Sequence, residues 1–195
     1  METAYGGLML RVTWEWIAID APALDVSNTV AVADGIEHDL LEPAGEYERW
    51  AAAAAGSSEL EPDEAVAIVR ARSRVLELRE HIRRVFGAAA AGEPLPRAAV
   101  TALNEVSRVA PRWVELRGDG VVEERTSGNP TDRLLAEYAR SAMLVAADGA
   151  AKLRVCPAPS CGMFYRPRRP QQRWCSEPCG NRARFARHYR ARRSA

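Results

Sequence analysis

The sequence predicts an α+β protein in two parts. A mostly helical N-terminal domain with a small β-sheet, residues 1–150, is followed by a small cysteine-rich unit, residues 151–195. Three observations lead to this prediction: apolar residues recur at helical spacing between residues 62 and 148, residues 8–19 alternate between apolar and polar, and all four cysteines lie between Cys156 and Cys179. The first part is long enough to bury a core of its own.

The first element expected along the chain is a β-strand within residues 8–19. Every second position there carries an apolar side chain, which gives the strand one face for a core: Leu8, Leu10, Val12, Trp14 and Trp16. Asp20-Ala-Pro-Ala then breaks the alternation. Residues 24–30 fit either a second short extended segment or the lead into a helix.

Two helices are expected next, over residues 46–55 and 62–86. Gly56 ends the first helix. The second begins with Pro62 and two acidic residues, which suit the unpaired amides and the positive dipole end of a first turn, and Gly87 ends it.

A third helix, a β-hairpin and a fourth helix complete the N-terminal domain. The third helix covers residues 96–109, and residues 113–125 fit a hairpin around the Asp119-Gly120 turn. Asn129 or Thr131 caps the fourth helix, which runs to about residue 148. Large aromatic side chains dominate small cores, so four tryptophans are expected in the core rather than in a ligand cage: Trp14, Trp16, Trp50 and Trp113.

Charge is strongly segregated along the chain, although the net charge is only +1. Residues 154–195 hold eleven arginines and one acidic residue, Glu177, which gives a charge of +10. Residues 1–153 hold sixteen basic and twenty-five acidic residues, which gives a charge of −9. A strongly basic segment beside an acidic body indicates a nucleic acid or another polyanion as a partner.

Membrane and secretory signals are missing from the sequence. No segment approaches the roughly 18 uninterrupted apolar residues of a membrane helix. The first residues, Met-Glu-Thr-Ala-Tyr-Gly-Gly, lack the basic and apolar regions of a signal peptide. A cytoplasmic protein without a membrane partner is therefore expected. Thiols stay reduced in that compartment, so clustered cysteines are interpreted as metal ligands before disulfides.

The cysteines follow the pattern Cys-x4-Cys-x13-Cys-x3-Cys and are predicted to bind one structural zinc ion: Cys156, Cys161, Cys175 and Cys179. Two short-spaced pairs suit a tetrahedral site, and four thiolates leave no open coordination position for catalysis. Residues 163–165 and 172–174 are expected to form a hairpin, and a helix to cover residues 177–193. Together these elements predict a treble-clef-like finger. A redox-responsive zinc switch is a less favoured alternative, because oxidation of the cysteines releases the metal.

The run from Arg173 to Arg182, Arg-Trp-Cys-Ser-Glu-Pro-Cys-Gly-Asn-Arg, resembles the CGNR zinc finger. In that family the finger follows a domain called ABATE. The N-terminal part resembles this domain in the order of its motifs, Leu24-Asp-x-x-Asn-Thr-Val30, Asp39-Leu-Leu and Tyr47-x-x-Trp50. The resemblance covers nearly the whole chain and implies a stress-induced transcription regulator. One departure is the arginine- and proline-rich turn after Phe164-Tyr165, where the family usually carries an aspartate and a serine.

An arginine-rich surface is predicted on the finger. Phe185, Ala186 and Tyr189 form a narrow apolar stripe that is expected to pack on Trp174 and the hairpin. Without interleaved glutamates the surrounding arginines repel one another unless a polyanion neutralises them, so phosphate contact is favoured over a merely solvated helix face. The residues expected to contact DNA are Arg168, Arg169, Arg182, Arg184, Arg187 and Arg190.

Three polar residues of the N-terminal domain, Asp25, Asn28 and Thr29, are candidates for lining a small-molecule pocket. A structural role is equally favoured, with Asn28 and Thr29 capping a helix and Asp25 making a turn bond. The sequence holds no GxSxG, HExxH, phosphate-loop or supported acid-pair motif, so no enzymatic activity is expected.

These features favour a zinc-dependent DNA-binding transcription regulator. Its N-terminal domain is expected to sense a small-molecule effector or to mediate association, including association into a homodimer. The main alternative is an RNA- or protein-binding zinc module without promoter specificity, which uses the same residues.

Overall fold

The computed structural model describes residues 3–5, 8–10, 21–33, 35–57, 62–149 and 152–193. Seven helices occur in these segments: α1 (Pro22–Ser27), α2 (Glu46–Ser57), α3 (Pro62–Arg70), α4 (Arg72–Ala91), α5 (Arg97–Val109), α6 (Pro130–Ala147) and α7 (Glu177–Arg193). The strands pair as four antiparallel hairpins: β1 (Thr3–Tyr5) with β2 (Leu8–Leu10), β3 (Val30–Ala33) with β4 (Ile36–Asp39), β5 (Arg112–Leu116) with β6 (Val122–Thr126), and β7 (Arg154–Val155) with β8 (Phe164–Tyr165). The chain is therefore mostly helical with small sheets, which confirms the predicted α+β class.

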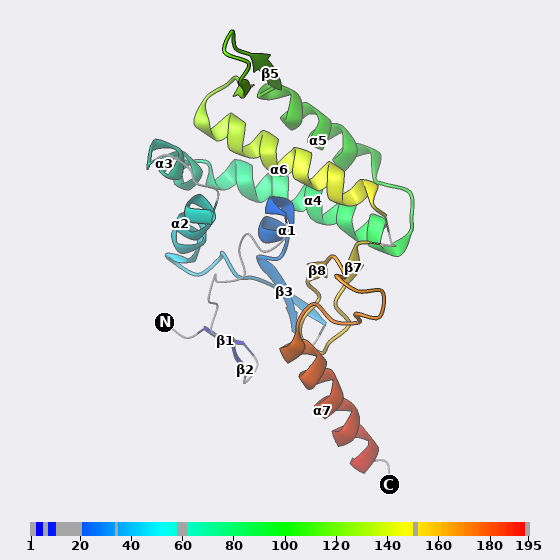
Figure 1. The fold of residues 1–195 in the computed structure, drawn as a ribbon. Helices are drawn as coiled ribbons and strands as arrows, with labels where there is room; N and C mark the ends of the chain where they lie inside the picture. Colours follow the sequence, from blue (N-terminus) through cyan, green and yellow to red (C-terminus); the bar gives the residue numbers. More distant parts are fainter. Residues whose placement is uncertain are drawn as a thin grey trace.

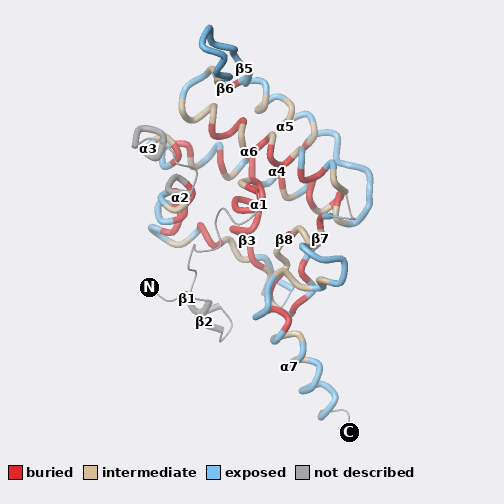
Figure 2. The backbone as a smooth tube through the Cα atoms, in the orientation of Figure 1, coloured by how far each residue is buried: buried red, intermediate tan, exposed pale blue. Residues whose placement is uncertain are grey.

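Helices α4, α5 and α6 lie side by side and form the main helical layer (Figure 1). Helix α1 packs on α4 and α6, where the backbone N–H of Ala23 donates to the Ser141 hydroxyl at 3.2 Å. Buried residues concentrate where α1, α4 and α6 meet, whereas most of α7 and the β5–β6 hairpin are exposed (Figure 2). The hydrophobic core is therefore formed mainly by the helices, and α7 and the β5–β6 hairpin project beyond it.

An aromatic cluster fills the core beside α2. The rings of Tyr47 and Trp50 lie 5.7 Å apart, and those of Trp50 and Tyr138 lie 6.4 Å apart. Trp50 is fully buried, which confirms its expected place. The same expectation is wrong for Trp113, which is 44 % exposed because it lies on the projecting β5–β6 hairpin. Trp14 and Trp16 lie outside the described residues.

The helix predicted over residues 62–86 is two helices in the structure. The chain breaks between α3 and α4 at Ala71, a buried residue. Helix α4 then continues past Gly87 to Ala91, because the alanines after Gly87 are strong helix formers. It ends at Gly92, whose left-handed φ of 71° suits glycine, and the N–H of Glu93 closes the end on the carbonyl of Ala88.

Residues 24–30 combine both of the predicted alternatives, a short helix and then a strand. Helix α1 ends at Ser27, and β3 begins at Val30 and pairs with β4. The β3–β4 hairpin was not predicted, since its strands have only four residues each. The strand predicted over residues 8–19 is described only at residues 8–10, as β2.

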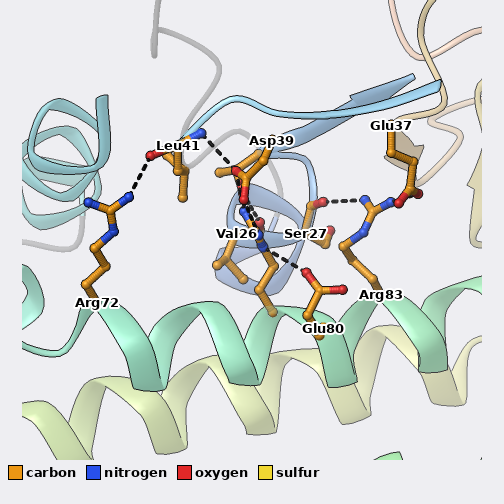
Figure 3. A network of polar contacts seen from close by, with 10 residues as sticks. Val26, Ser27, Glu37, Asp39, Leu41, Arg72, Glu80 and Arg83 are labelled. Atoms are coloured by element: carbon orange, nitrogen blue, oxygen red, sulfur yellow. Dashed lines mark hydrogen bonds and ion pairs between the residues drawn. The ribbon is translucent and has the colours of Figure 1, made fainter. Parts of the chain in front are cut away.

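Arginines of α4 hold the hairpin and α1 in place (Figure 3). Arg79 is buried and donates to both carboxylate oxygens of Asp39, at 2.8 and 2.6 Å, and to the Thr29 hydroxyl at 3.1 Å. One turn along, Arg83 donates to the carbonyl of Ser27 at 2.9 Å and pairs with Glu37 at 2.5 Å. Charge-assisted bonds of this kind fix geometry strongly, so the position of α1 and β3 is set from α4.

We expect Asp39→Asn to destabilise the fold at neutral pH by about 1–3 kcal/mol, because it removes the charged partner of the buried Arg79. Burial raises the pKa of Asp39, but the hydrogen bond and charge of Arg79 outweigh it and hold that pKa below the ordinary value. The carboxylate therefore contributes stability above the unfolded pKa of about 4, and this contribution is lost as the pH falls through the lower folded pKa.

Urea unfolding of the Asp39→Asn variant and the unchanged protein between pH 7 and pH 3 measures this contribution. The difference in unfolding free energy is expected to be constant near neutral pH and to shrink below about pH 4. Glu42→Gln, an exposed change on the same segment, is the matched control. A difference that does not depend on pH would contradict the assigned role of the Asp39 charge.

Candidate functional site

The cysteine-rich unit is built from two short strands, a loop and α7. Strands β7 and β8 flank the first cysteine pair, and Arg154 pairs with Tyr165 across them. The N–H of Cys156 donates to the carbonyl of Met163 at 2.8 Å and closes the knuckle. The predicted hairpin between residues 163–165 and 172–174 is wrong, because β8 pairs with the preceding strand β7 and not with residues 172–174. The prolines of the turn after β8 carry no N–H with which to extend a ladder toward residues 172–174.

The four predicted ligand residues converge on one point. Their Sγ atoms all lie within 4.8 Å of one another: Cys156, Cys161, Cys175 and Cys179. Three of the separations are 3.5–3.7 Å, between Cys161, Cys175 and Cys179. A tetrahedron of thiolates around zinc, with Zn–S bonds of about 2.3 Å, requires S–S distances of about 3.8 Å. The residues therefore fit a single zinc ion.

Hydrogen bonds within the cluster favour thiolates at two positions. Bonds from Cys161 and Cys175 lower the pKa of Cys156 to about 6, and bonds from the other three thiols lower the pKa of Cys179. Hydrogen bonds with neighbouring thiols raise the pKa values of Cys161 and Cys175. Zinc binds thiolates, so it displaces the protons that remain.

The residues around Cys179 build the start of α7 into the metal site. The Ser176 hydroxyl accepts from the N–H of Cys179 at 3.4 Å, as expected for a helix cap. Arg182 donates to the Sγ of Cys179 at 3.1 Å. A Cβ atom on Gly180 would lie 3.2 Å from the Trp174 ring, so this position favours glycine. Asn181 accepts from Arg184 at 2.5 Å.

A pair of hydrogen bonds joins the cysteine-rich unit to the N-terminal domain. The Asn28 amide donates to the carbonyl of Phe164 at 2.9 Å and accepts from the N–H of Phe164 at 2.8 Å. Both residues are buried. The Phe164 ring lies in the core of the N-terminal domain, 5.5 Å from the Phe86 ring, with Arg83 at 5.8 Å. Asn28 therefore replaces a missing strand partner for β8.

Two further contacts reinforce this junction. The N–H of Val32 in β3 donates to the carbonyl of Cys161 at 3.1 Å. A Cβ atom on the following Gly162 would lie 2.5 Å from Val32, and Gly162 has a φ of 66°, so only glycine suits the position. Arg166 pairs with Asp148 at 2.7 Å on another side of the junction.

The candidate pocket residues Asp25, Asn28 and Thr29 are all buried. The polar groups of Asn28 and Thr29 are engaged within the protein, since Thr29 donates to the carbonyl of Val26 at 2.7 Å and accepts from Arg79. A hollow of about 480 Å³ lies instead between α4 and the cysteine-rich unit, lined in part by Ala90 and Tyr165. Both side chains therefore make structural bonds, but the Asn28 side chain bonds to Phe164 of the finger instead of capping a helix. No local signal in the sequence pairs Asn28 with Phe164.

The structure divides the six predicted DNA-contacting arginines into three groups. Arg168 and Arg169 lie exposed on the turn after β8, whereas Arg182 is half-buried against Cys179. The other three are exposed along α7: Arg184, Arg187 and Arg190. Figure 1 shows α7 extending away from the helical layer. None of the described helices is long and apolar enough to span a membrane.

The apolar stripe expected to pack on the finger is exposed instead. Phe185 and Tyr189 are 75 % and 64 % exposed. Trp174 contacts the start of α7, with Gly180 beneath it and the Arg184 guanidinium 5.9 Å from its ring. Trp174 directly precedes a metal ligand, so it reaches only the first turns of the helix, and the later residues lie beyond it.

We expect Asn28→Ala to lower the free energy of unfolding by about 2–4 kcal/mol, because it leaves the buried N–H and carbonyl of Phe164 without partners. Urea unfolding of the zinc-loaded protein measures the loss. Asn104→Ala removes the same side chain from a half-buried position on α5 where the structure gives it no bond, so this variant is expected to lose much less stability than Asn28→Ala. A loss of the same size in both variants is therefore not expected. Equal stability of the two variants would contradict the role given to Asn28.

Two known protein-family models together match nearly the whole chain. The ABATE family model, described as "Putative stress-induced transcription regulator", matches residues 20–151. The CGNR zinc finger model matches residues 152–193, which contain the four-cysteine site. A search of curated proteins gave no significant match. The protein therefore belongs to the ABATE family, with a CGNR zinc finger at its C-terminal side.

Proposed function

We propose that this protein is a transcription regulator that binds DNA through the arginines of its zinc finger. Zinc acts structurally in this proposal, because four thiolates fill its coordination shell and leave no position for a substrate. The metal fixes the start of α7 relative to the N-terminal domain. The proposed role is binding, without an enzymatic step.

The observation that carries the proposal is the exposure of α7. Beyond its first turns the helix has no packed face: the described side chains from Arg184 to Arg192 are exposed, except for the half-buried Ala186. An α-helix with its side chains is about 10–12 Å wide, and the major groove of B-DNA is about 12 Å wide. A helix that is exposed over most of its length and anchored at its N-terminal end is suited to enter such a groove.

The charges on this helix support a polyanionic partner. Arginines of the N-terminal domain are commonly paired with carboxylates, as Arg74 is with Asp132 and Arg112 with Glu137. Among the described residues, no carboxylate pairs with Arg168, Arg169, Arg184 or Arg187. Phosphate groups of a nucleic acid supply the missing negative charge, and binding then falls steeply as salt rises.

The six arginines are proposed to have different tasks. Arg184, Arg187 and Arg190 on α7 face the groove, where arginine donates two hydrogen bonds to guanine or contacts phosphates. Arg168 and Arg169 on the turn after β8 contact the flanking backbone. Arg182 acts mainly at the metal site, through its bond to Cys179.

Selection of bound duplexes from a random pool by the zinc-loaded full chain tests the regulator role. Recovery of one enriched sequence is the expected result. Recovery of random sequences, or a preference for structured RNA over duplex DNA, would overturn promoter recognition in favour of a zinc module without sequence specificity.

We expect the triple change of Arg184, Arg187 and Arg190 to alanine to weaken duplex DNA binding by at least tenfold. It should also lower the slope of log affinity against log salt by about 2–3, because up to three phosphate contacts are lost. Gel-shift titrations at several salt concentrations measure both quantities. The matched control replaces three exposed arginines of the N-terminal domain, Arg70, Arg97 and Arg108, and is expected to bind nearly as before. Equal weakening of both triple variants would show a non-specific charge effect.

A further inference from the structure

The β5–β6 hairpin has an exposed edge strand and an exposed apolar face. It has two strands, and all five residues of β5 are exposed. Val114, Leu116 and Val122 share one face and are 68, 73 and 62 % exposed. A two-stranded hairpin is marginally stable alone in water, and the unpaired backbone groups of an exposed edge strand form a template for pairing with another chain.

The hydrogen-bond pattern shows which backbone groups of β5 are free to pair. The N–H of Arg117 donates to the carbonyl of Val121, and the N–H of Ser127 donates to the carbonyl of Pro111. Bonded and non-bonded pairs alternate along an antiparallel ladder. The backbone groups of Arg112, Val114 and Leu116 therefore point away from β6, along the open edge of β5.

We infer that this edge pairs with the same edge of a second copy of the chain, with Val114 opposite Val114 on a two-fold axis. This register places Arg112 opposite Leu116 of the other copy, so every outward N–H and carbonyl of β5 gains a partner. The result is a four-stranded antiparallel sheet with an apolar centre made by the two Val114 side chains. The Leu116 side chain then lies along the aliphatic stem of Arg112.

Charge complementarity favours a second copy of the chain as the partner, and it favours pairing through β5 rather than through β6. In the β5 register no like charges lie opposite each other, since Trp113 faces Glu115 on the other side of the sheet. The equivalent pairing of β6 centres on Glu124, so it would place two carboxylates directly opposite each other, which is unfavourable. Residues 112–126 hold three arginines and four acidic residues, so the hairpin is nearly neutral and is poorly suited to DNA.

The position of the hairpin is compatible with the metal site. Figure 1 shows β5 at the end of the molecule away from α7. Pairing through β5 therefore leaves α7 uncovered, and a dimer presents two such helices. This inference does not depend on DNA binding, because it rests on the hairpin alone.

Sedimentation velocity of the zinc-loaded full chain between about 1 and 200 µM tests the inference, a range in which small interfaces associate. The mass is expected to rise from 21.4 kDa toward twice that value. Val114→Pro removes the outward N–H on the axis and is expected to remain a monomer, since proline is tolerated on an edge strand. Val122→Pro makes the same change on the opposite edge and is expected to dimerise like the unchanged chain.

A charge pair tests the register. Val114→Glu and Val114→Lys each place like charges on the axis and should be monomeric, whereas an equimolar mixture of the two should form heterodimers. Far-ultraviolet circular dichroism and zinc content confirm that each variant is folded. A chain that stays monomeric throughout, growth beyond the dimer, loss of association in Val122→Pro, or a monomeric Glu and Lys mixture would overturn the inference.

Discussion

The two hydrogen bonds between the Asn28 side chain and the backbone of Phe164 are the constraint on which the rest of the structure depends. They lie where the short helix α1, the strand β8 and the core of the N-terminal domain meet. Both bonds are buried, so neither water nor another side chain replaces them. Asn28 therefore makes the zinc finger part of one packed structure, although its sequence could be that of a separate module.

The position of Asn28 is itself set by charge. Arg79 crosses from α4 to Asp39 and Thr29, and this anchors the turn that carries Asn28. On the finger side, Phe164 follows Cys161 by three residues, so zinc fixes its backbone. Occupancy of the metal site and the orientation of α7 are thereby connected to the core through few residues. In the proposed regulator this arrangement holds the start of α7 in place at the metal site and leaves its later turns exposed.

Sequence patterns predict most of the local structure and little of the junction. The cysteine spacing identifies the metal site because ligand chemistry is local, and Asn129 is confirmed as the cap of α6. The same local reasoning misses the break at the buried Ala71 between α3 and α4. It also ends α4 at Gly87, although the alanines that follow favour a longer helix. The contact of Asn28 with Phe164 spans 136 residues, and no periodicity encodes such a pair. The apolar residues Phe185 and Tyr189 do not indicate from sequence alone that this part of α7 lies beyond the elements that pack on its start.

Hydrogen exchange of single backbone amides tests most directly whether finger and N-terminal domain form one unit. The N–H of Phe164 donates to Asn28, and the N–H of Val32 donates to Cys161. In the zinc-loaded protein both are predicted to exchange with opening free energies within about 1 kcal/mol of that of Ile82 in the core of α4. Removal of zinc is predicted to release these two amides while Ile82 stays protected. Fast exchange of Phe164 and Val32 with zinc bound and Ile82 protected would contradict the account.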